Sequence, residues 1–158
     1  MNGAHFHLVV NHLPIVGLLI GILILITGLA LKKVDTQLTA LGVFIFSAVS
    51  SIVAFNTGEG AEEVVEKISG ISETLIHRHE EFAESFFTVI LILGGMSIIT
   101  IFTLIRRNKY AKYFLYLSLA LAISAGVLAK FVGTSGGEIR HSEIRSEAQM
   151  IPVEKEDH

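Results

Sequence analysis

Four long apolar stretches constrain the fold of this chain more than any other feature. They cover residues 13–31, 38–55, 82–105 and 113–132 of a 158-residue sequence. Each is close to the ~20 residues that a helix needs to cross a ~30 Å hydrocarbon core, and only Glu84 and Lys130, both near an end, are charged. Strands are excluded because an open sheet cannot satisfy its backbone in lipid. The sequence therefore predicts an all-α integral membrane protein, an up-down-up-down four-helix bundle.

The charged residues in the links between these stretches indicate which side of the membrane each link occupies. The first and third links, 32–37 and 106–112, contain six lysines and arginines and a single acid, Asp35. Short loops rich in Lys and Arg stay in the cytoplasm. We therefore expect a multi-pass protein of the inner (cytoplasmic) membrane, with both termini, the link 56–81 and the tail outside, periplasmic or extracellular. The expected transmembrane domain covers residues 1–135, and the outer tail covers 136–158, with a disordered end at 154–158.

Composition narrows the possible chemistry. The chain has no cysteine, which excludes disulfides, thiolate metal sites and a Cys nucleophile, so histidine, glutamate or aspartate must hold any metal or cofactor. It contains no Walker A loop, no dinucleotide fingerprint and no HExxH motif. The interleaving of basic and aromatic residues expected of a nucleic-acid-binding protein is also missing. These features favour an electron carrier or cofactor-binding subunit over an enzyme, with no nucleic-acid partner.

The predicted topology brings every histidine to the outer side: His5, His7, His12, His77, His79, His141 and His158. At 100° per residue, the apolar side chains around His79 fall within about 60° of it, whereas His77 falls on the opposite face among acids. His79 is therefore expected to point into the bundle. It is either a core histidine bonded to a carbonyl or a cofactor ligand, since neutral imidazole is the commonest metal ligand and ionisable groups inside membranes usually have a function.

Two other outer segments are candidates to surround His79, the entry to the first span and the start of the tail. Pro14 suits the first turn of a helix, so Asn11 or His12 should cap that helix, and His12 would face His79 across the outer mouth of the bundle. The glycines at 133, 136 and 137 are expected to release the chain from the fourth helix and let Arg140 and His141 fold back over this mouth.

Acids in the second link have helical spacing, which predicts an amphipathic surface helix. A carboxylate from it, such as Glu59 or Glu62, could orient a bundle histidine through a hydrogen bond.

Stripes of small residues mark three of the four spans. They comprise Gly17 and Gly21 in the first, Ser47, Ser51, Ala54 and Gly58 along the second, and Ser118, Ala122, Ala125, Ala129 and Gly133 in the fourth. Such stripes indicate close helix packing in lipid; the alternative is a slot for a flat macrocycle. They exceed what one small bundle needs, so we expect a homodimer or a place in a larger complex.

Taken together, four segments resemble the DUF2231 family of small four-helix membrane proteins. They are His7-x4-His12-Leu-Pro, Thr57-Gly-Glu, His79-Glu-x2-Ala-Glu and Gly136-Gly-x3-His141. Family members occur joined to c-type cytochrome modules, which implies an electron-transfer setting. The resemblance implies that the cofactor or metal ligands are His7, His12, His79 and His141.

Three functions agree with these patterns. The first, which we favour, is a b-type cytochrome that holds haem b through paired histidines and exchanges electrons with a quinol or a periplasmic cytochrome. The second is a metal-binding module that holds Zn, Cu or non-haem Fe through His and Glu. The third is a cofactor-free structural subunit of a membrane complex.

The natural absence of cysteine makes the orientation directly testable. Asn108→Cys in the third link should resist an impermeant thiol reagent in intact cells, because this loop is predicted to be cytoplasmic. Gly60→Cys in the second link should be labelled. The opposite labelling pattern would reverse the predicted topology.

Overall fold

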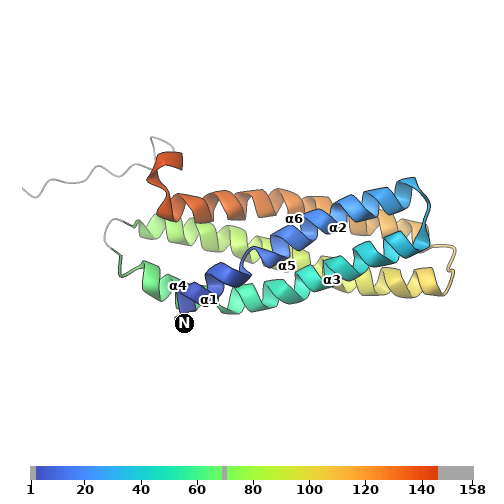
Figure 1. Cartoon of the computed structure of the whole chain (residues 1–158), viewed down its shortest axis with the longest axis horizontal. Helices are drawn as coiled ribbons and strands as arrows, with labels where there is room; N and C mark the ends of the chain where they lie inside the picture. The colour runs from blue at the N-terminus through green and yellow to red at the C-terminus, as the bar shows by residue number, and fades with distance from the viewer. Residues whose placement is uncertain (1–2, 69–70, 146–158) are drawn as a thin grey trace, which may run out of the picture.

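The fold is built from helices alone in the part of the chain that the computed structural model describes, residues 3–68 and 71–145. The elements are α1 (Gly3–Val10), α2 (Leu13–Ala30), α3 (Val34–Asn56), α4 (Gly58–Val65), α5 (Glu73–Ile105), α6 (Ala111–Arg140) and the short 3₁₀ turn η1 (Ser142–Ile144) (Figure 1). Four helical segments, Ala4–Ala30, Val34–Val65, Glu73–Ile105 and Ala111–Arg140, are long and apolar enough to cross a membrane. The predicted all-α four-helix membrane fold is confirmed.

The long helices form two antiparallel hairpins, α2–α3 and α5–α6, which lie side by side (Figure 1). Helix α3 packs against α5, and α2 packs against α6. The short helices α1 and α4 contact each other at one end of the bundle, which we call the histidine end. The opposite end, which we call the basic end, contains the 32–33 and 106–112 turns.

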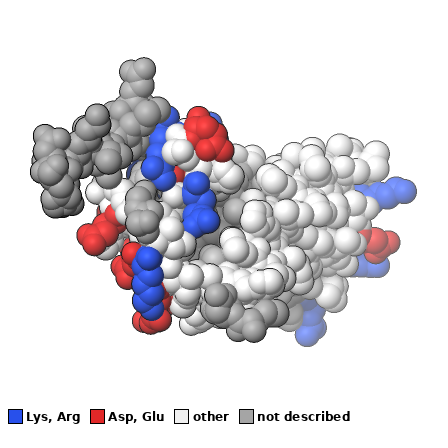
Figure 2. All heavy atoms as spheres, turned by 60° about the vertical axis from the view of Figure 1, so that its left-hand side comes forward, with Lys and Arg blue, Asp and Glu red and all other residues white. Residues whose placement is uncertain are grey.

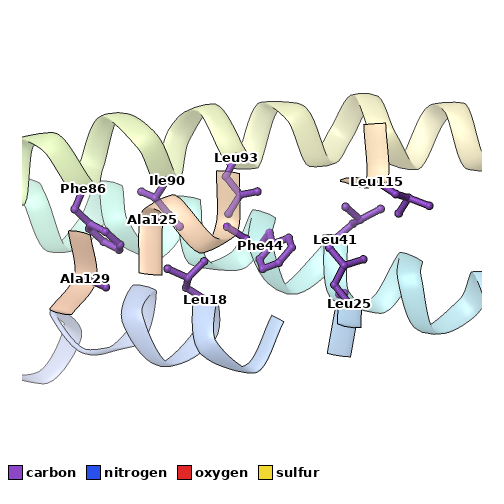
Figure 3. Packing of buried hydrophobic residues seen from close by; sticks show 12 residues of the cluster. Leu18, Leu25, Leu41, Phe44, Phe86, Ile90, Leu93, Leu115, Ala125 and Ala129 are labelled. Carbon is purple, nitrogen blue, oxygen red and sulfur yellow. The ribbon is translucent and has the colours of Figure 1, made fainter. Parts of the chain in front are cut away.

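One apolar cluster runs along the bundle axis, and Figure 3 shows its packing. Leu18, Phe44, Ile90 and Leu93 are completely buried in it. Large apolar side chains also cover the outside, for example Leu23, which is 67% exposed, and Phe102, which is 60% exposed. In water such a surface would be an interaction or aggregation site, whereas in a bilayer it faces hydrocarbon.

The predicted close packing of small residues is confirmed for most of the stripes. A Cβ atom at Gly21 would lie 2.5 Å from a ring carbon of Phe44, and one at Gly17 would clash with the hydroxyl of Ser47. Ser47 and Ser118 are completely buried. Gly133 differs, because nothing lies within 4 Å of the position its Cβ would occupy.

Buried hydroxyl groups find their hydrogen-bond partners without water. Ser47 donates to the carbonyl of Val43 at 3.0 Å, and Ser97 donates to that of Leu93 at 2.7 Å. Thr100 donates to Met96 at 2.7 Å, and its hydroxyl lies 3.0 Å from that of Ser118 on α6. Bonding to the preceding turn lets Ser and Thr sit inside an apolar bundle.

Both hairpins turn in the same way at the basic end. Lys32 and Arg107 adopt left-handed conformations, with φ of 53° and 50°. The following residues, Lys33 and Asn108, donate backbone hydrogen bonds to the carbonyls of Gly28 and Thr103 at 3.0 and 2.9 Å. This six-to-one bond defines a Schellman motif, which satisfies carbonyls that a helix end would otherwise leave open.

Cations rest on aromatic rings at the turn of the second hairpin. The guanidinium of Arg106 lies 5.2 Å from the ring centre of Phe102. The ammonium groups of Lys109 and Lys112 lie 5.0 and 4.9 Å from the rings of Tyr110 and Tyr113. Such contacts are attractive because the face of an aromatic ring is negative.

The prediction that the glycines after residue 132 end the fourth helix is wrong. Helix α6 continues through Gly133, Gly136 and Gly137 to Arg140. A glycine inside a helix costs only about 1 kcal/mol relative to alanine, and Arg145 closes the end by donating to the carbonyls of Glu138 and Ile139 at 2.7 and 2.9 Å. The expected disordered end, 154–158, and His158 lie outside the described residues.

The contact between Gly21 and Phe44 predicts a position-specific effect on stability. Gly21→Ala should lower the free energy of unfolding by about 1–3 kcal/mol, the usual cost of overpacking. Gly42→Ala is the matched control, because nothing lies within 4 Å of its added Cβ. The measurement is thermal unfolding in detergent followed by circular dichroism, and equal midpoints for the two variants would contradict this packing.

Candidate histidine site

Helix α5 turns His79 into the bundle and leaves His77 outside, as the helical periodicity predicts. The imidazole of His79 is half-buried, and its Nδ1 lies 3.1 Å from the hydroxyl oxygen of Ser135 on α6. The His77 side chain is 74% exposed and pairs with Glu80, with 3.1 Å between Nδ1 and Oε2.

The second imidazole at this end belongs to His7 on α1. Its Nδ1 lies 3.1 Å from the carbonyl oxygen of Ala54 and 3.0 Å from the hydroxyl oxygen of Thr57, which tethers α1 to the end of α3. His7 is an electrostatic neighbour of His79, and His12 is an electrostatic neighbour of His7. The fold thus brings together two histidines that are 72 positions apart in the sequence.

The hydrogen bonds indicate that the imidazoles of His7 and His79 are the same tautomer. Thr57 donates its hydroxyl proton to the carbonyl of Ala54 at 2.9 Å, and Ser135 donates its own to the carbonyl of Val132 at 3.2 Å. The carbonyl of Ala54 also lies 3.1 Å from Nδ1 of His7, and the carbonyl of Val132 also bonds to the His79 ring. A carbonyl oxygen can only accept a hydrogen bond. Nδ1 is therefore the protonated nitrogen, and the lone pair available for a ligand is on Nε2 of His7 and of His79.

Asn11 adds an unsatisfied acceptor next to His7. Its backbone N–H donates to the carbonyl of His7 at 2.9 Å, so the two side chains are one helical turn apart and share a face. The side-chain oxygen of Asn11 is buried without a hydrogen-bond partner among the described residues. Such a group costs about 1–3 kcal/mol, which a bound hydrogen-bond donor would recover.

The other two predicted ligands, His12 and His141, lie at more open positions. His12 is exposed at the N-cap of α2, and its side chain makes no capping bond. His12 is an electrostatic neighbour of His7, and its predicted pairing with His79 stays a prediction. His141 is exposed, and its Nδ1 lies 2.9 Å from Oε1 of Glu143. The backbone N–H of Glu143 and the His141 ring lower the pKa of the Glu143 carboxyl below its ordinary value. Arg140 is also exposed.

The predicted amphipathic helix is α4, and its acids do not orient the histidine pair. Glu59 is exposed, and the carboxyl of Glu62 hydrogen-bonds to that of Glu80 on α5. The atoms that bond to Nδ1 of His7 and His79 are hydroxyl and carbonyl oxygens. Within the described residues, no group of three or more His, Cys, Asp or Glu side chains is arranged to hold a metal ion.

An ion pair beside the site was missed by the sequence analysis. Arg78 lies 3.2 Å from the Glu138 carboxylate, whose side chain is only 9% exposed. The Arg78 guanidinium also lies 5.8 Å from the ring centre of Phe82, which stacks on Phe131 of α6. Charged side chains of both signs gather at the histidine end (Figure 2). The pair of Arg78 and Glu138 joins α5 to α6 one turn beyond Ser135.

Thr57 and Ser135 were also missed as partners of the histidines. Each is followed directly by a glycine, in the segments Thr57-Gly and Ser135-Gly. Gly136 lets the His79 imidazole approach the backbone, because a Cβ there would lie 3.0 Å from Cε1 of His79, whereas a Cβ at Gly58 would lie in ordinary contact distance, 4.0 Å from Cε1 of His7. A hydroxyl residue followed by glycine at the outer end of the second and fourth helices was the signal available in the sequence.

Comparisons of the chain with protein-family models, with curated proteins and with solved structures found no match. The resemblance to DUF2231 stays a prediction.

The approach of Gly136 to His79 predicts that a methyl group there displaces the ring. Gly136→Ala should increase the rate at which diethyl pyrocarbonate modifies His79, because the ring must move toward solvent. Gly133→Ala, one turn earlier in open space, should leave that rate unchanged. Mass spectrometry of the modified peptides measures both rates, and equal rates would contradict the close approach.

Proposed function

We propose that this protein is a membrane electron carrier that binds haem, with His7 and His79 as the axial ligands of the iron. The observation that carries the proposal is that both imidazoles are the same tautomer, protonated at Nδ1. They converge at one end of the bundle, with Nδ1 held by an acceptor and the lone pair left on Nε2. Metal-bound histidines nearly always donate their other ring N–H to a nearby acceptor.

The presence of two histidine ligands at this end supports haem in particular. The four porphyrin nitrogens already bind the haem iron, so the protein needs to supply only two further ligands. The described residues offer such a pair and no group of three or more ligands. Both Nε2 atoms and the oxygen of Asn11 are acceptors, so the site suits a Lewis acid rather than an anion.

In this function the protein would hold and orient the haem and tune its reduction potential. The haem iron supplies one-electron chemistry, and the bundle sets its potential through the basicity of its ligands and its exposure to solvent. His7 lies 25 positions before the turn residue Lys32, which is roughly 37 Å of helix at 1.5 Å per residue. A hydrocarbon core is ~30 Å thick, so the pair would lie at the membrane surface, within reach of both a quinol and a soluble cytochrome.

A second candidate function is direct binding of Zn, Cu or non-haem Fe. The hydrogen-bonded carboxyls of Glu62 and Glu80 at the same end favour it, because carboxylate ligands suit hard metal ions. We also propose that the bundle works as a homodimer or as a subunit of a larger membrane complex.

Removal of one ligand should abolish the low-spin haem spectrum. We expect the full-length wild-type protein, purified in mild detergent and supplied with haemin, to show a Soret band and sharp reduced α and β bands. His79→Ala and His7→Ala should each become high-spin or lose haem, because one axial ligand is gone. Absorption spectra and haem content are the measurements.

Matched controls separate the pair from the neighbouring histidines. His77→Ala, two positions from His79 and exposed, should keep the wild-type spectrum, and so should His12→Ala. A wild-type protein that binds no haem but contains stoichiometric Zn, Cu or Fe would favour the second function. Binding of neither would overturn both functions and leave the structural-subunit hypothesis.

A further inference from the structure

The two halves of the chain repeat one design. In each half a histidine begins the hairpin, a left-handed basic residue turns it, and a hydroxyl residue followed by glycine ends it. The first half has His7, Lys32 and Thr57, and the second has His79, Arg107 and Ser135. In both, the hydroxyl donates to the carbonyl three residues earlier and accepts from Nδ1 of the histidine.

The spacing within each half is symmetric about the turn. Lys32 lies 25 positions after His7 and 25 before Thr57. Arg107 lies 28 positions after His79 and 28 before Ser135. Because the rise per residue is the same in both arms of a helical hairpin, equal arms return the hydroxyl to the level of the histidine. A change of three residues in one arm alone would move the two groups apart by about one helical turn, or ~5 Å.

The packing of the helices follows the same repeat. A half turn about the bundle axis exchanges α2 with α5 and α3 with α6. The observed neighbours obey this exchange, since α3 packs on α5 and α2 packs on α6. Each imidazole is therefore anchored within its own hairpin, and the pair comes together where the hairpins meet.

From this repeat we infer that Thr57 and Ser135 are equivalent positioning residues, which act with the backbone carbonyls three residues earlier to hold His7 and His79 as Nδ1–H tautomers, with each Nε2 atom available to a ligand. The inference rests on the proposed function for the identity of the ligand, haem iron, although the tautomers are a property of the protein alone. The hydroxyls do not contact the ligand. They act through the ring, because a hydrogen bond from Nδ1–H makes Nε2 a stronger electron donor.

The tautomers can be measured in the protein before any haem is added. Ring nitrogen chemical shifts of ¹⁵N-histidine-labelled protein distinguish a protonated from an unprotonated nitrogen. We expect His7 and His79 to be protonated at Nδ1. Thr57→Val should shift the ring nitrogen resonances of His7 only, and Ser135→Ala should shift those of His79 only, because each variant removes one acceptor of the Nδ1–H while the backbone carbonyls of Ala54 and Val132 remain.

The haem-loaded protein provides a second readout. Each variant should bind haem about tenfold or more weakly, as is typical when a partner of a metal-bound histidine is removed, and each should have a more positive reduction potential, because a weaker donor stabilises ferric iron less. Thr57→Ser restores the hydroxyl and should return both properties to wild-type values. Ser124→Ala is the control on α6, because that hydroxyl bonds to Ala120 of its own helix at 3.0 Å and to no histidine.

The outcomes separate this inference from the proposed function. If haem never binds but the ring shifts follow the expected pattern, the positioning role stands and the haem function fails. If haem binds and neither variant changes the ring shifts or the potential, the positioning role is overturned while the function survives. A wild-type protein with His7 or His79 protonated at Nε2 would also overturn the inference.

Discussion

Inside a bilayer, a polar group must find its hydrogen-bond partner within the protein. This constraint governs the middle of the bundle, and the half-buried polar groups at its two ends are satisfied in the same way, by neighbouring parts of the chain. Along the core, hydroxyls such as Ser97 and Thr100 bond to the preceding turn of their own helix. At the basic end, the Schellman turns at Lys32 and Arg107 satisfy the last carbonyls of α2 and α5. At the histidine end the same requirement fixes the imidazoles, because the acceptors for their N–H groups are hydroxyls and carbonyls of neighbouring helices.

Small residues make these internal partners reachable. Gly21 lets α2 approach the ring of Phe44 on α3, and Gly136 lets α6 approach the ring of His79. The first contact is apolar and contributes to stability through packing. The second brings the backbone next to an imidazole, so that the Ser135 hydroxyl reaches Nδ1. Close approach between helices therefore serves both the core and the candidate site.

The sequence was sufficient for features that depend on composition and helical periodicity. Span length predicted the four helices, and the apolar face around Leu75 and Phe86 placed His79 inside and His77 outside, as the structure confirms. The path through Gly133 and Gly136 was predicted wrongly, because local propensity disfavours glycine in a helix by an amount that tertiary contacts easily offset.

Features that depend on the relative height and rotation of distant segments were harder to foresee. The contact of His7 with Ala54 and Thr57 at the end of α3 depends on the break between α1 and α2 at residues 11–12, which resets the helical phase. The hydroxyl partners Thr57 and Ser135 depend on two arms of equal length on either side of a turn. That equality is visible in the sequence only after the turn residues Lys32 and Arg107 are known from their backbone conformation.

The cations that rest on aromatic rings at the basic end all belong to the second hairpin: Arg106, Lys109 and Lys112. Aromatic and cationic side chains of this kind prefer the boundary between headgroups and hydrocarbon. In a bilayer these contacts would hold the basic ends of α5 and α6 at that boundary, and the first hairpin would follow through its packing against the second. Counted from the turn residue to the histidine or hydroxyl residue, each arm of the second hairpin is three residues longer than those of the first, so a bilayer thinner than this hairpin would be accommodated by tilting of the bundle.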